Sequence, residues 1–388
     1  MAKNFVLGID IGSSGVQSVV AGWDKRGEGL KILGVGSSPS SGIRRGKIID
    51  IEETSKSLKA SVVMAEKKSG LRLRSGVLSV GGTDLAYVRS KGLIMVSRAN
   101  HEISEFDAAR ALEQCQSNIE PLTNREVLHS FALSFTVDGQ FKTPDPTGMV
   151  GSKLECEAIF ITALSRDIKN VVRVAELSGF MAEDVIASPI AAARAVLPKR
   201  HKEVGAMLID IGAGTSSLAV FEEGLPISLE VLPYGSANIT SDLAIGFKTT
   251  IDEAENMKKN FSASSASSKK QAADIISARL SDIFELTNKH LKKIDRVKLL
   301  PAGVVLTGGG ARLPDLPDFV KDYLELPVRM GDFEETRMPD GLDIGPWSVA
   351  VGLCIMAYDA SQGRPGFGSN LTAKTKNAAF RWLKSLLP

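Results

Sequence analysis

The sequence predicts an α/β protein with two similar lobes that face each other across a cleft. The first observation is a duplication: residues 6–20 and 207–220 share one pattern at an offset of 200, which aligns Asp10 with Asp210 and Gly12 with Gly212. The second is that each copy reads as an apolar strand, a glycine-rich turn, a second strand, a polar turn and a third strand. The third is a set of amphipathic helical segments between and after the copies. An internal repeat of this size indicates two related structural units.

The composition is that of an ordinary folded protein. A chain of 388 residues suffices for two or three domains, and 43% hydrophobic with 24% charged residues excludes a wholly disordered, collagen-like or coiled-coil chain. The net charge of +2 gives no reason to expect a nucleic-acid partner. No apolar run approaches the roughly 18 residues of a membrane-spanning helix, and the N-terminus shows no signal-peptide core. With three widely spaced cysteines, we expect a cytoplasmic protein.

Apolar periodicity predicts the main helices. Residues 52–68 and 167–177 place apolar side chains on one face among charges, and Gly179 ends the second segment. Residues 271–294 carry a longer apolar stripe, interrupted on that face by Thr287. The stripe consists of Ile276, Leu280, Ile283, Phe284, Leu291 and Ile294. This spacing predicts one long amphipathic helix packed on a lobe.

The remaining segments divide the chain into parts. Residues 85–165 alternate strand-like and helical runs and read as an α+β subdomain inserted in the first lobe. The serine-rich residues 262–270 are expected to form a surface loop, and residues 359–373 a linker rich in glycine and proline. The expected division is a first lobe of residues 1–84, 166–200 and 341–358, a second lobe of residues 201–340 with its upper part at about 242–300, and a tail of residues 374–388.

Two glycine-rich turns predict a phosphate-binding site. Glycines in a tight turn allow backbone N–H groups to surround an anion. The turns are Gly12, Ser13, Ser14 and Gly15 in the first copy, and Gly212, Ala213, Gly214 and Thr215 in the second. The aspartate before each turn repels phosphate but can hold magnesium, usually through water, and the ion then bridges phosphate oxygens. Asp10 and Asp210 are therefore the candidate magnesium residues.

A third glycine-rich segment strengthens this interpretation. Gly308, Gly309 and Gly310 follow the strand-like residues 304–307 and are expected to form a flat shelf for a base or ribose. Any one of these segments alone is more often an ordinary hairpin turn, in which glycine supplies a positive φ. Three together, two of them copies with a leading aspartate, favour a nucleotide site.

Other motifs do not support a competing site. Residues 42–48 have the wrong spacing for a Walker loop and lack a Ser or Thr after Lys47, and no Gly-x-Gly-x-x-Gly joins a strand to a helix. The four histidines have no ligand-like spacing, and no Gly-x-Ser-x-Gly or Cys–His arrangement supports nucleophilic catalysis. Arg44, Arg45 and residues 199–202 read as solvated loop charges.

Several stretches resemble the FtsA family of bacterial cell-division proteins. The duplicated Asp-Ile-Gly turn and the late Thr-Gly-Gly-Gly are similar to the actin-like ATPase superfamily, and residues 145–151, 234–244, 253–258 and 303–311 resemble FtsA. The resemblance runs from residue 5 to about 355 and returns at the C-terminal tail. It implies an actin-like fold that binds ATP and magnesium, with Glu255 and Lys258 near the ribose or base. From the sequence alone, those two residues would be an i,i+3 pair on a helix surface.

The same resemblance implies slow ATP hydrolysis. Relatives that hydrolyse ATP well often carry Glu or Gln before the proline of a lobe-crossing helix, where Ser188 stands here. The second turn also ends in Ser216 and Ser217, where many such relatives have an acidic residue. Serine can hydrogen-bond a water molecule but is a poor base. We expect at most a slow ATPase, with Ser188 as a weak candidate for positioning water.

The C-terminal residues 374–388 predict an amphipathic helix. Its apolar face and cationic border consist of Phe380, Arg381, Trp382, Leu383, Lys384, Leu386 and Leu387. Such a helix is suited to the interface of an anionic membrane, whereas the alternative is a helix that completes the core. The FtsA resemblance implies membrane targeting. Since one short helix binds weakly, stable attachment requires many tails on one polymer.

These expectations combine into one predicted function. The chain is expected to bind ATP, to polymerise on the inner face of the cell membrane and to anchor FtsZ filaments at the division site; FtsZ rests on the resemblance alone. One alternative is a PilM-type pilus-assembly protein, which shares the fold and recruits a partner's peptide. Another is a small-molecule kinase of the same superfamily, which needs a catalytic aspartate beyond Asp10 and Asp210.

Overall fold

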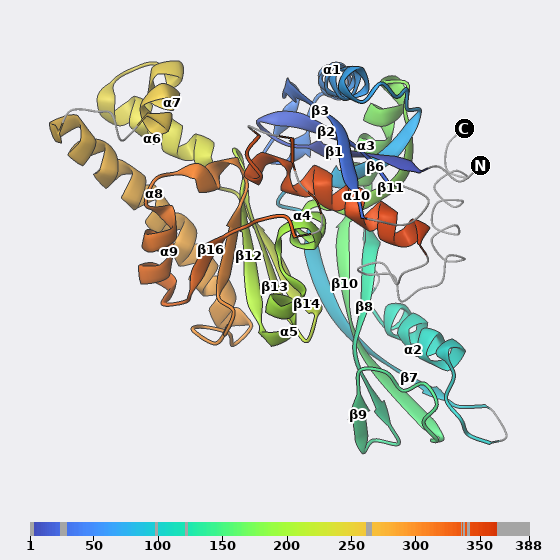
Figure 1. The fold of residues 1–388 in the computed structure, drawn as a ribbon. Helices are drawn as coiled ribbons and strands as arrows, with labels where there is room; N and C mark the ends of the chain where they lie inside the picture. The colour runs from blue at the N-terminus through green and yellow to red at the C-terminus, as the bar shows by residue number, and fades with distance from the viewer. Residues whose placement is uncertain are drawn as a thin grey trace.

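The computed structural model shows two lobes side by side and a third unit below the first lobe (Figure 1). The residues it describes are 4–23, 29–97, 100–120, 123–260, 266–334, 336, 338–339 and 342–362. The first lobe is at the upper right of Figure 1 and the second lobe is on the left. This arrangement confirms the two-lobed α/β class that the duplication predicts.

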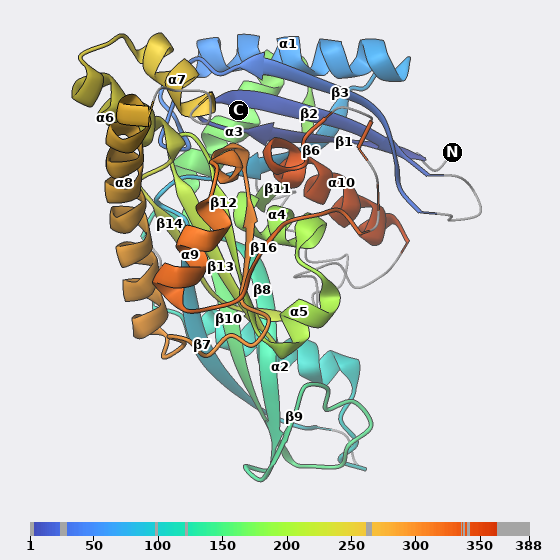
Figure 2. The same cartoon turned by 60° about the vertical axis from the view of Figure 1, so that its left-hand side comes forward.

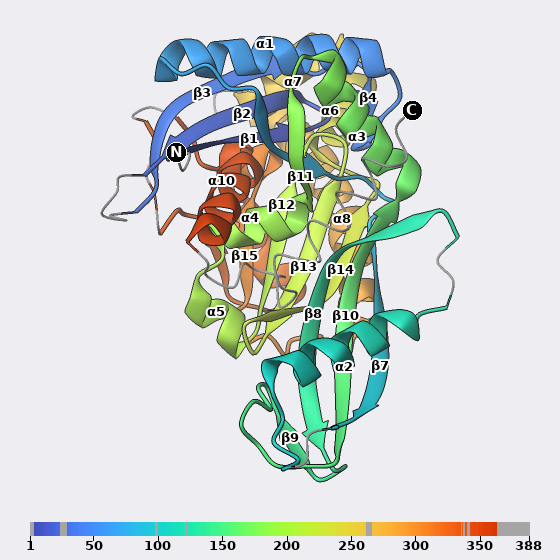
Figure 3. The same cartoon turned by 90° about the vertical axis from the view of Figure 1, so that its right-hand side faces the viewer.

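The first lobe is built on a five-stranded sheet in the order β11–β6–β1–β2–β3. Its strands are β1 (Phe5–Ile11), β2 (Gly15–Gly22), β3 (Lys31–Pro39), β6 (Ser75–Val80) and β11 (Met181–Ala187). β1 is antiparallel to β2 and parallel to β6, so β1 and β6 both end at the same edge of the sheet. The helices α1 (Ile51–Ser69) and α3 (Ser165–Leu177) cover one face, and α4 (Ser188–Val196) and α10 (Ser348–Ser361) the other (Figure 3).

The second lobe repeats this plan in the order β14–β13–β12–β15–β16. The strands are β12 (Ala206–Ile211), β13 (Ser216–Glu222), β14 (Leu225–Leu232), β15 (Val304–Thr307) and β16 (Val328–Met330). β12 is antiparallel to β13 and parallel to β15, as β1 is to β2 and β6. Because side chains alternate along a strand, Met207 and Ile209 face the second lobe's own core, whereas Ala206 and Leu208 join the core of the first lobe.

Helices cover the outer face of the second sheet. They are α8 (Ala266–Lys293) and α9 (Leu316–Leu324), while α6 (Ser236–Phe247) packs on α8. Helix α8 runs along the edge of the lobe in Figure 2. Five of the six residues of the predicted apolar stripe are buried in this core, including Ile283 and Phe284 at 0% exposure, whereas Ile294 follows the end of α8 and is partly buried. Thr287 is also buried, and its hydroxyl donates a hydrogen bond to the Ile283 carbonyl at 3.0 Å. The one polar side chain on this face is therefore hydrogen-bonded within its own helix.

A separate antiparallel sheet forms the unit below the first lobe (Figure 3). Its order is β7–β10–β8–β9, with β7 (Ala86–Met95), β8 (Arg125–Val137), β9 (Phe141–Thr143) and β10 (Lys153–Leu164). The helix α2 (Glu105–Ser117) packs on β7 and β10. The sheet has its own core around Leu112, Leu154 and Phe160, while Phe131 and Ile159 extend into the core of the first lobe.

Two expectations about connecting segments need correction. Helix α8 begins at Ala266, so residues 266–270 are helical and the loop predicted for them is wrong. Serine and lysine are acceptable in a helix that is already propagating, and Gln271 attaches this end to the Gly246 carbonyl at 3.1 Å. Helix α10 likewise continues to Ser361, into the predicted linker.

The predicted tail helix lies outside the described residues. Residues 363–388 include all of the candidate membrane-facing side chains. In the described ranges, no helix is both long enough and apolar enough to cross a bilayer.

Candidate functional site

A cavity of about 650 Å³ lies between the two lobes, within the size range of small-molecule sites. The predicted residues that line it are Asp10, Gly12, Ser13, Ser14, Ser188, Asp210, Gly212, Ala213, Gly214, Thr215, Glu255, Lys258, Gly308, Gly309 and Gly310. Of the predicted nucleotide residues, Gly15 is not on the wall. Its carbonyl oxygen accepts a hydrogen bond from the Gly12 N–H at 3.1 Å and closes the first turn.

The two glycine turns have the same internal geometry. The Gly212 N–H donates to the Thr215 carbonyl at 2.9 Å, which reproduces the bond between Gly12 and Gly15. The first residues of α6 lie directly on the second turn, because the Ser236 N–H donates to the Gly212 carbonyl at 2.9 Å. The duplication seen in the sequence therefore extends to single backbone hydrogen bonds.

The two turns approach each other closely across the cavity. A Cβ on Gly214 would lie 2.9 Å from the Ser13 Oγ, which belongs to the other lobe. Such a separation is shorter than ordinary van der Waals contact, so a larger residue at Gly214 would require the Ser13 side chain to shift or the lobes to move apart. Glycine at this position permits close approach of the two lobes.

The two aspartates sit at the ends of β1 and β12 and face the cavity. Burial raises the pKa of Asp10 to about 6, and a hydrogen bond from the Ser79 hydroxyl at 2.7 Å partly offsets this effect. Burial, together with the negative charge of Asp10, raises the pKa of Asp210 to about 7. Desolvation and mutual repulsion disfavour two charged carboxylates here, and a cation between them would relieve both effects.

The donor set fits a magnesium ion that keeps part of its hydration shell. Carboxylate oxygens are the hard ligands that magnesium prefers, and magnesium usually uses one or two of them together with water and phosphate oxygens. In the part of the chain that the structure describes, no group of three or more His, Cys, Asp or Glu side chains forms a complete metal site. Two aspartates beside two phosphate-type turns match this incomplete coordination.

The glycine shelf, residues 308–310, lies in close contact with Asp210. Gly308 has φ of 90°, which favours glycine, and a Cβ at this position would collide with the Asp210 Oδ1. The next residues form a short 3₁₀ turn, Gly309–Arg312. The segment therefore presents bare backbone to the cavity, as the sequence predicts.

Glu255 and Lys258 are not a simple surface pair. They lie on α7 (Ile251–Lys259), and the Lys258 side chain is only 8% exposed. Its Nζ contacts the Glu255 Oε2 at 2.7 Å and donates to the Thr240 Oγ1 at 2.8 Å and the Ser236 carbonyl at 3.1 Å. Burial acts to raise the pKa of Glu255, but hydrogen bonds from Lys258 and Thr240 and the nearby lysine charges lower it overall. The network fixes α7 against α6, beside the cavity.

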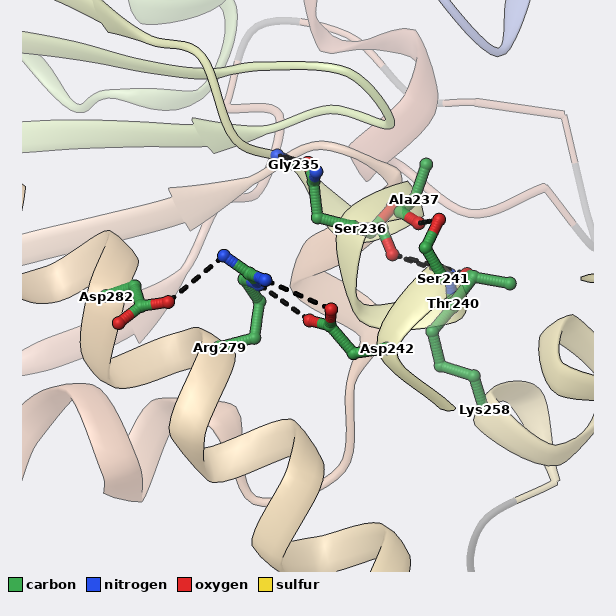
Figure 4. Close-up of polar contacts among 10 residues, drawn as sticks. Gly235, Ser236, Ala237, Thr240, Ser241, Asp242, Lys258, Arg279 and Asp282 are labelled. Atoms are coloured by element: carbon green, nitrogen blue, oxygen red, sulfur yellow. Dashed lines mark hydrogen bonds and ion pairs between the residues drawn. The ribbon is translucent and has the colours of Figure 1, made fainter. Parts of the chain in front are cut away.

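A second polar contact holds α6 from the other side (Figure 4). Arg279 on α8 donates to both oxygens of Asp242, at 2.6 and 3.0 Å, and to Asp282 at 3.0 Å. Its guanidinium also lies 5.4 Å from the centroid of the Tyr234 ring. Since Tyr234 directly precedes the α6 N-terminal turn, this contact helps to fix the cavity wall.

Some wall residues are absent from the sequence prediction. They include Gln17, Gly46, Ser79, Gly81, Gly82, Ser236, Arg312 and Pro346. Gly81 and Gly82 follow a buried strand, and this pattern of a strand followed by glycine could have identified them. Gly46 belongs to residues 42–48, which lack the spacing of a Walker loop, and it reaches the wall only through the tertiary structure. Ser188 lies close to Gly81, where a Cβ would be 3.1 Å from the Ser188 Oγ.

Comparisons with known proteins give both a family and a fold. A family model described as "Cell division protein FtsA" matches residues 207–352, and one described as "SHS2 domain inserted in FTSA" matches residues 82–162. The chain is 33% identical over 345 residues to the cell division protein FtsA of Bacillus subtilis (strain 168), which covers 84% of this chain and 78% of that protein.

Two solved structures share the fold. The PilM–PilN type IV pilus biogenesis complex is similar at a TM-score of 0.64 and 18% identity, covering 90% of this chain and 97% of that one. MreB5 of Spiroplasma citri bound to ADP is similar at a TM-score of 0.55 and 12% identity, covering 93% and 98%. At these identities, the likeness concerns the actin-like fold alone.

Proposed function

Because the chain belongs to the FtsA family of cell-division proteins, we propose that it binds ATP and magnesium in the interlobe cavity and uses the nucleotide to control assembly. The observation that carries this proposal is the pair of aspartate-preceded glycine turns, which close with the same hydrogen bond and face each other across one cavity. The similarity in fold to an MreB5 structure bound to ADP supports the same assignment.

The proposed binding mode assigns each part of the wall to one part of the nucleotide. Backbone N–H groups at the tips of the two turns, Ser13 and Ser14 in the first and Ala213 and Gly214 in the second, bind the phosphates, and Asp10 and Asp210 hold magnesium through water. Glu255 and Lys258 lie beside the ribose or base, with residues 308–310 as the shelf. When bound, the magnesium ion neutralises phosphate charge.

The proposed chemistry is slow hydrolysis or none. Among the described residues that line the cavity, the carboxylates are Asp10, Asp210 and Glu255. The first two face the proposed metal position, and Glu255 is held by Lys258 and Thr240. Ser188, at the start of α4, offers a neutral hydroxyl that can position water but cannot activate it efficiently. A turnover number well below about one per second is expected.

The proposed cellular role combines this switch with membrane attachment. The C-terminal residues 374–388 would lie in the inner face of the cell membrane, where copies assembled into filaments attach together and anchor FtsZ filaments at the septum. Family membership supports the division role, and the apolar and cationic pattern of the tail supports the membrane contact.

Co-sedimentation with anionic vesicles tests this role. The intact chain should sediment with vesicles, more strongly with ATP and magnesium, and FtsZ filaments should sediment with it. A matched variant, Phe380→Glu, places a charge on the apolar face and should remain in the supernatant. Equal sedimentation of the intact chain and the variant would contradict the membrane role.

An assay of phosphoryl transfer distinguishes the small-molecule kinase alternative from the proposed function. A kinase would transfer phosphate from ATP to glucose or acetate, whereas the proposed protein should leave both acceptors unchanged. A PilM-type protein would not carry FtsZ filaments to vesicles, so the same sedimentation assay addresses that alternative.

A further inference from the structure

A small cationic hairpin contacts both glycine turns, residues 12–15 and 212–215. It consists of β4 (Ile43–Arg44) and β5 (Lys47–Ile48), with Arg45 and Gly46 as the turn. The Gly46 N–H donates to the Ser13 Oγ at 2.9 Å, and Gly46 lines the cavity. The Arg45 Cα lies 3.3 Å from the position of a Cβ on Gly214, in the turn of the other lobe. Arg45, whose side chain is exposed as the sequence predicts, therefore directly precedes a residue of the cavity wall.

The hairpin is held firmly in this position. Ile43 and Ile48 are paired across the two strands and pack against the core of the first lobe. Lys47 forms an ion pair with Asp84. A Cβ on Gly46 would lie 2.7 Å from the Gly82 backbone nitrogen, so the tip fits closely between neighbouring segments. Its contact with the phosphate turn is therefore fixed by packing on several sides.

Arg45 is an unusual residue for the tip of such a turn. Its φ is 50°, in the left-handed region where Gly, Asn and Asp are favoured in two-residue hairpin loops. The side chain is exposed, and across the described ranges no carboxylate forms an ion pair with its guanidinium. The chain thus places the backbone of an arginine with an exposed, unpaired side chain beside the Gly214 turn, at a position where the backbone favours another residue.

We propose that Arg45 binds the terminal phosphate of a nucleoside triphosphate, so that the site distinguishes triphosphate from diphosphate. This inference rests on the proposed function. In the proposed binding mode the base and ribose contact the second lobe at α7 and the shelf, so the phosphate end extends toward Ser13, Gly214 and the hairpin. A guanidinium can donate two parallel hydrogen bonds to phosphate oxygens.

The contact would also respond to closure of the cleft. Arg45 belongs to the first lobe, whereas Gly214 belongs to the second, and the two meet only where the lobes approach each other. A terminal phosphate held by Arg45 and by the residues 212–215 turn joins the two lobes. A diphosphate lacks the group that completes this bridge, so the triphosphate would favour the closed arrangement.

Measured affinities for ATP and ADP, each with magnesium, test the inference on the full chain. Arg45→Gly removes the guanidinium and suits the left-handed φ, so the fold is not endangered. It should weaken ATP binding about tenfold or more, in the range of a lost charged hydrogen bond, and change ADP binding less than about twofold. Arg45→Lys should restore part of the preference, because lysine keeps the charge without the planar fork.

Arg44→Ala is the matched control. Arg44 is exposed and pairs with Lys47 across the hairpin, whereas the Cα that approaches Gly214 belongs to Arg45. Its removal deletes one positive charge of the same hairpin and should leave the ratio of ATP to ADP affinity unchanged. A ratio altered equally by both variants would indicate a general field of charge and overturn the assignment to Arg45.

The outcomes separate this inference from the proposed function. If the unaltered chain binds neither nucleotide, the proposed function fails and this inference fails with it. If the unaltered chain binds both nucleotides and Arg45→Gly leaves the affinity ratio unchanged, this inference alone is overturned. A selective loss of ATP affinity supports it.

Discussion

Asp10→Asn should stabilise the nucleotide-free protein at neutral pH while it abolishes magnesium-dependent nucleotide binding. The Asp10 carboxyl faces the cavity, where we propose that it holds a metal ion, and without an ion its charge is poorly solvated. Burial raises its pKa to about 6 from the ordinary value of 3.8. Asparagine keeps an oxygen that can accept the Ser79 hydrogen bond at 2.7 Å but carries no charge.

The sign and the size of the effect follow from the pKa shift. The folded carboxyl holds its proton to higher pH than the carboxyl of the unfolded chain, so stability falls as the pH rises from about 4 to about 6. Each pKa unit corresponds to about 1.4 kcal/mol. The shift from 3.8 to about 6 therefore costs about 3 kcal/mol at pH 7, and the substitution should recover much of it. Loss of the Asp10 charge also removes repulsion from Asp210.

Urea denaturation of the full chain, without nucleotide or magnesium, measures this effect. The free energies of unfolding of the two proteins should be similar near pH 4 and should diverge as the pH rises to 7. Asp322→Asn, on the exposed surface of α9, is the control and should change stability little at any pH. Equal stabilities at pH 7, or a difference that does not vary with pH, would refute the reasoning. Added ATP and magnesium should stabilise the unaltered protein and not Asp10→Asn.

Three further predictions concern the shelf, the α7 network and the tail. Gly308→Ala should lower both the free energy of unfolding and, by about tenfold or more, the affinity for ATP, because φ is 90° and the new Cβ meets the Asp210 carboxylate. Gly139→Ala is the control for the backbone effect, since Gly139 has φ of 70° and open space around it. Denaturation measures the stability and calorimetry the affinity. Lys258→Met should weaken ATP binding more than Lys259→Met, because Lys258 is buried among its partners; equal affinities by titration would contradict this. A chain ending at residue 373 should keep its melting temperature and ATP affinity but lose vesicle binding. Unchanged sedimentation with vesicles would contradict the membrane role and favour a tail that packs on the core.

Several features of this protein follow from local sequence alone. The offset of 200 between the two aspartates predicts two related lobes, because strands joined by a glycine turn are specified by residues close together in the chain. The stripe of residues 271–294 predicts a helix with one buried face, because helical periodicity is local. The glycine turns predict their own closed geometry, since glycine has the required backbone freedom. The structure has each of these features.

Errors in the sequence prediction occur where local signals are weak. Residues 266–270 are rich in serine and lysine and carry little apolar pattern, yet they are helical because they continue α8. Residues 359–361, predicted as part of the linker, extend α10 for the same reason. A helix end depends on packing and on cooperative extension from its neighbours, and sequence composition describes neither of them.

The properties of the candidate site depend on tertiary structure. Ser79 reaches Asp10 from 69 residues away, and burial of both lobes' aspartates raises their pKa values. Lys258 and Glu255, which the local spacing assigns to a helix surface, enter a buried network because α6 packs over them. Sequence patterns determine backbone conformation and the faces of helices and strands, since these depend on neighbouring residues. Burial, electrostatics and the meeting of Arg45 with Gly214 depend on segments far apart in the chain, and only the folded arrangement of the two lobes decides them.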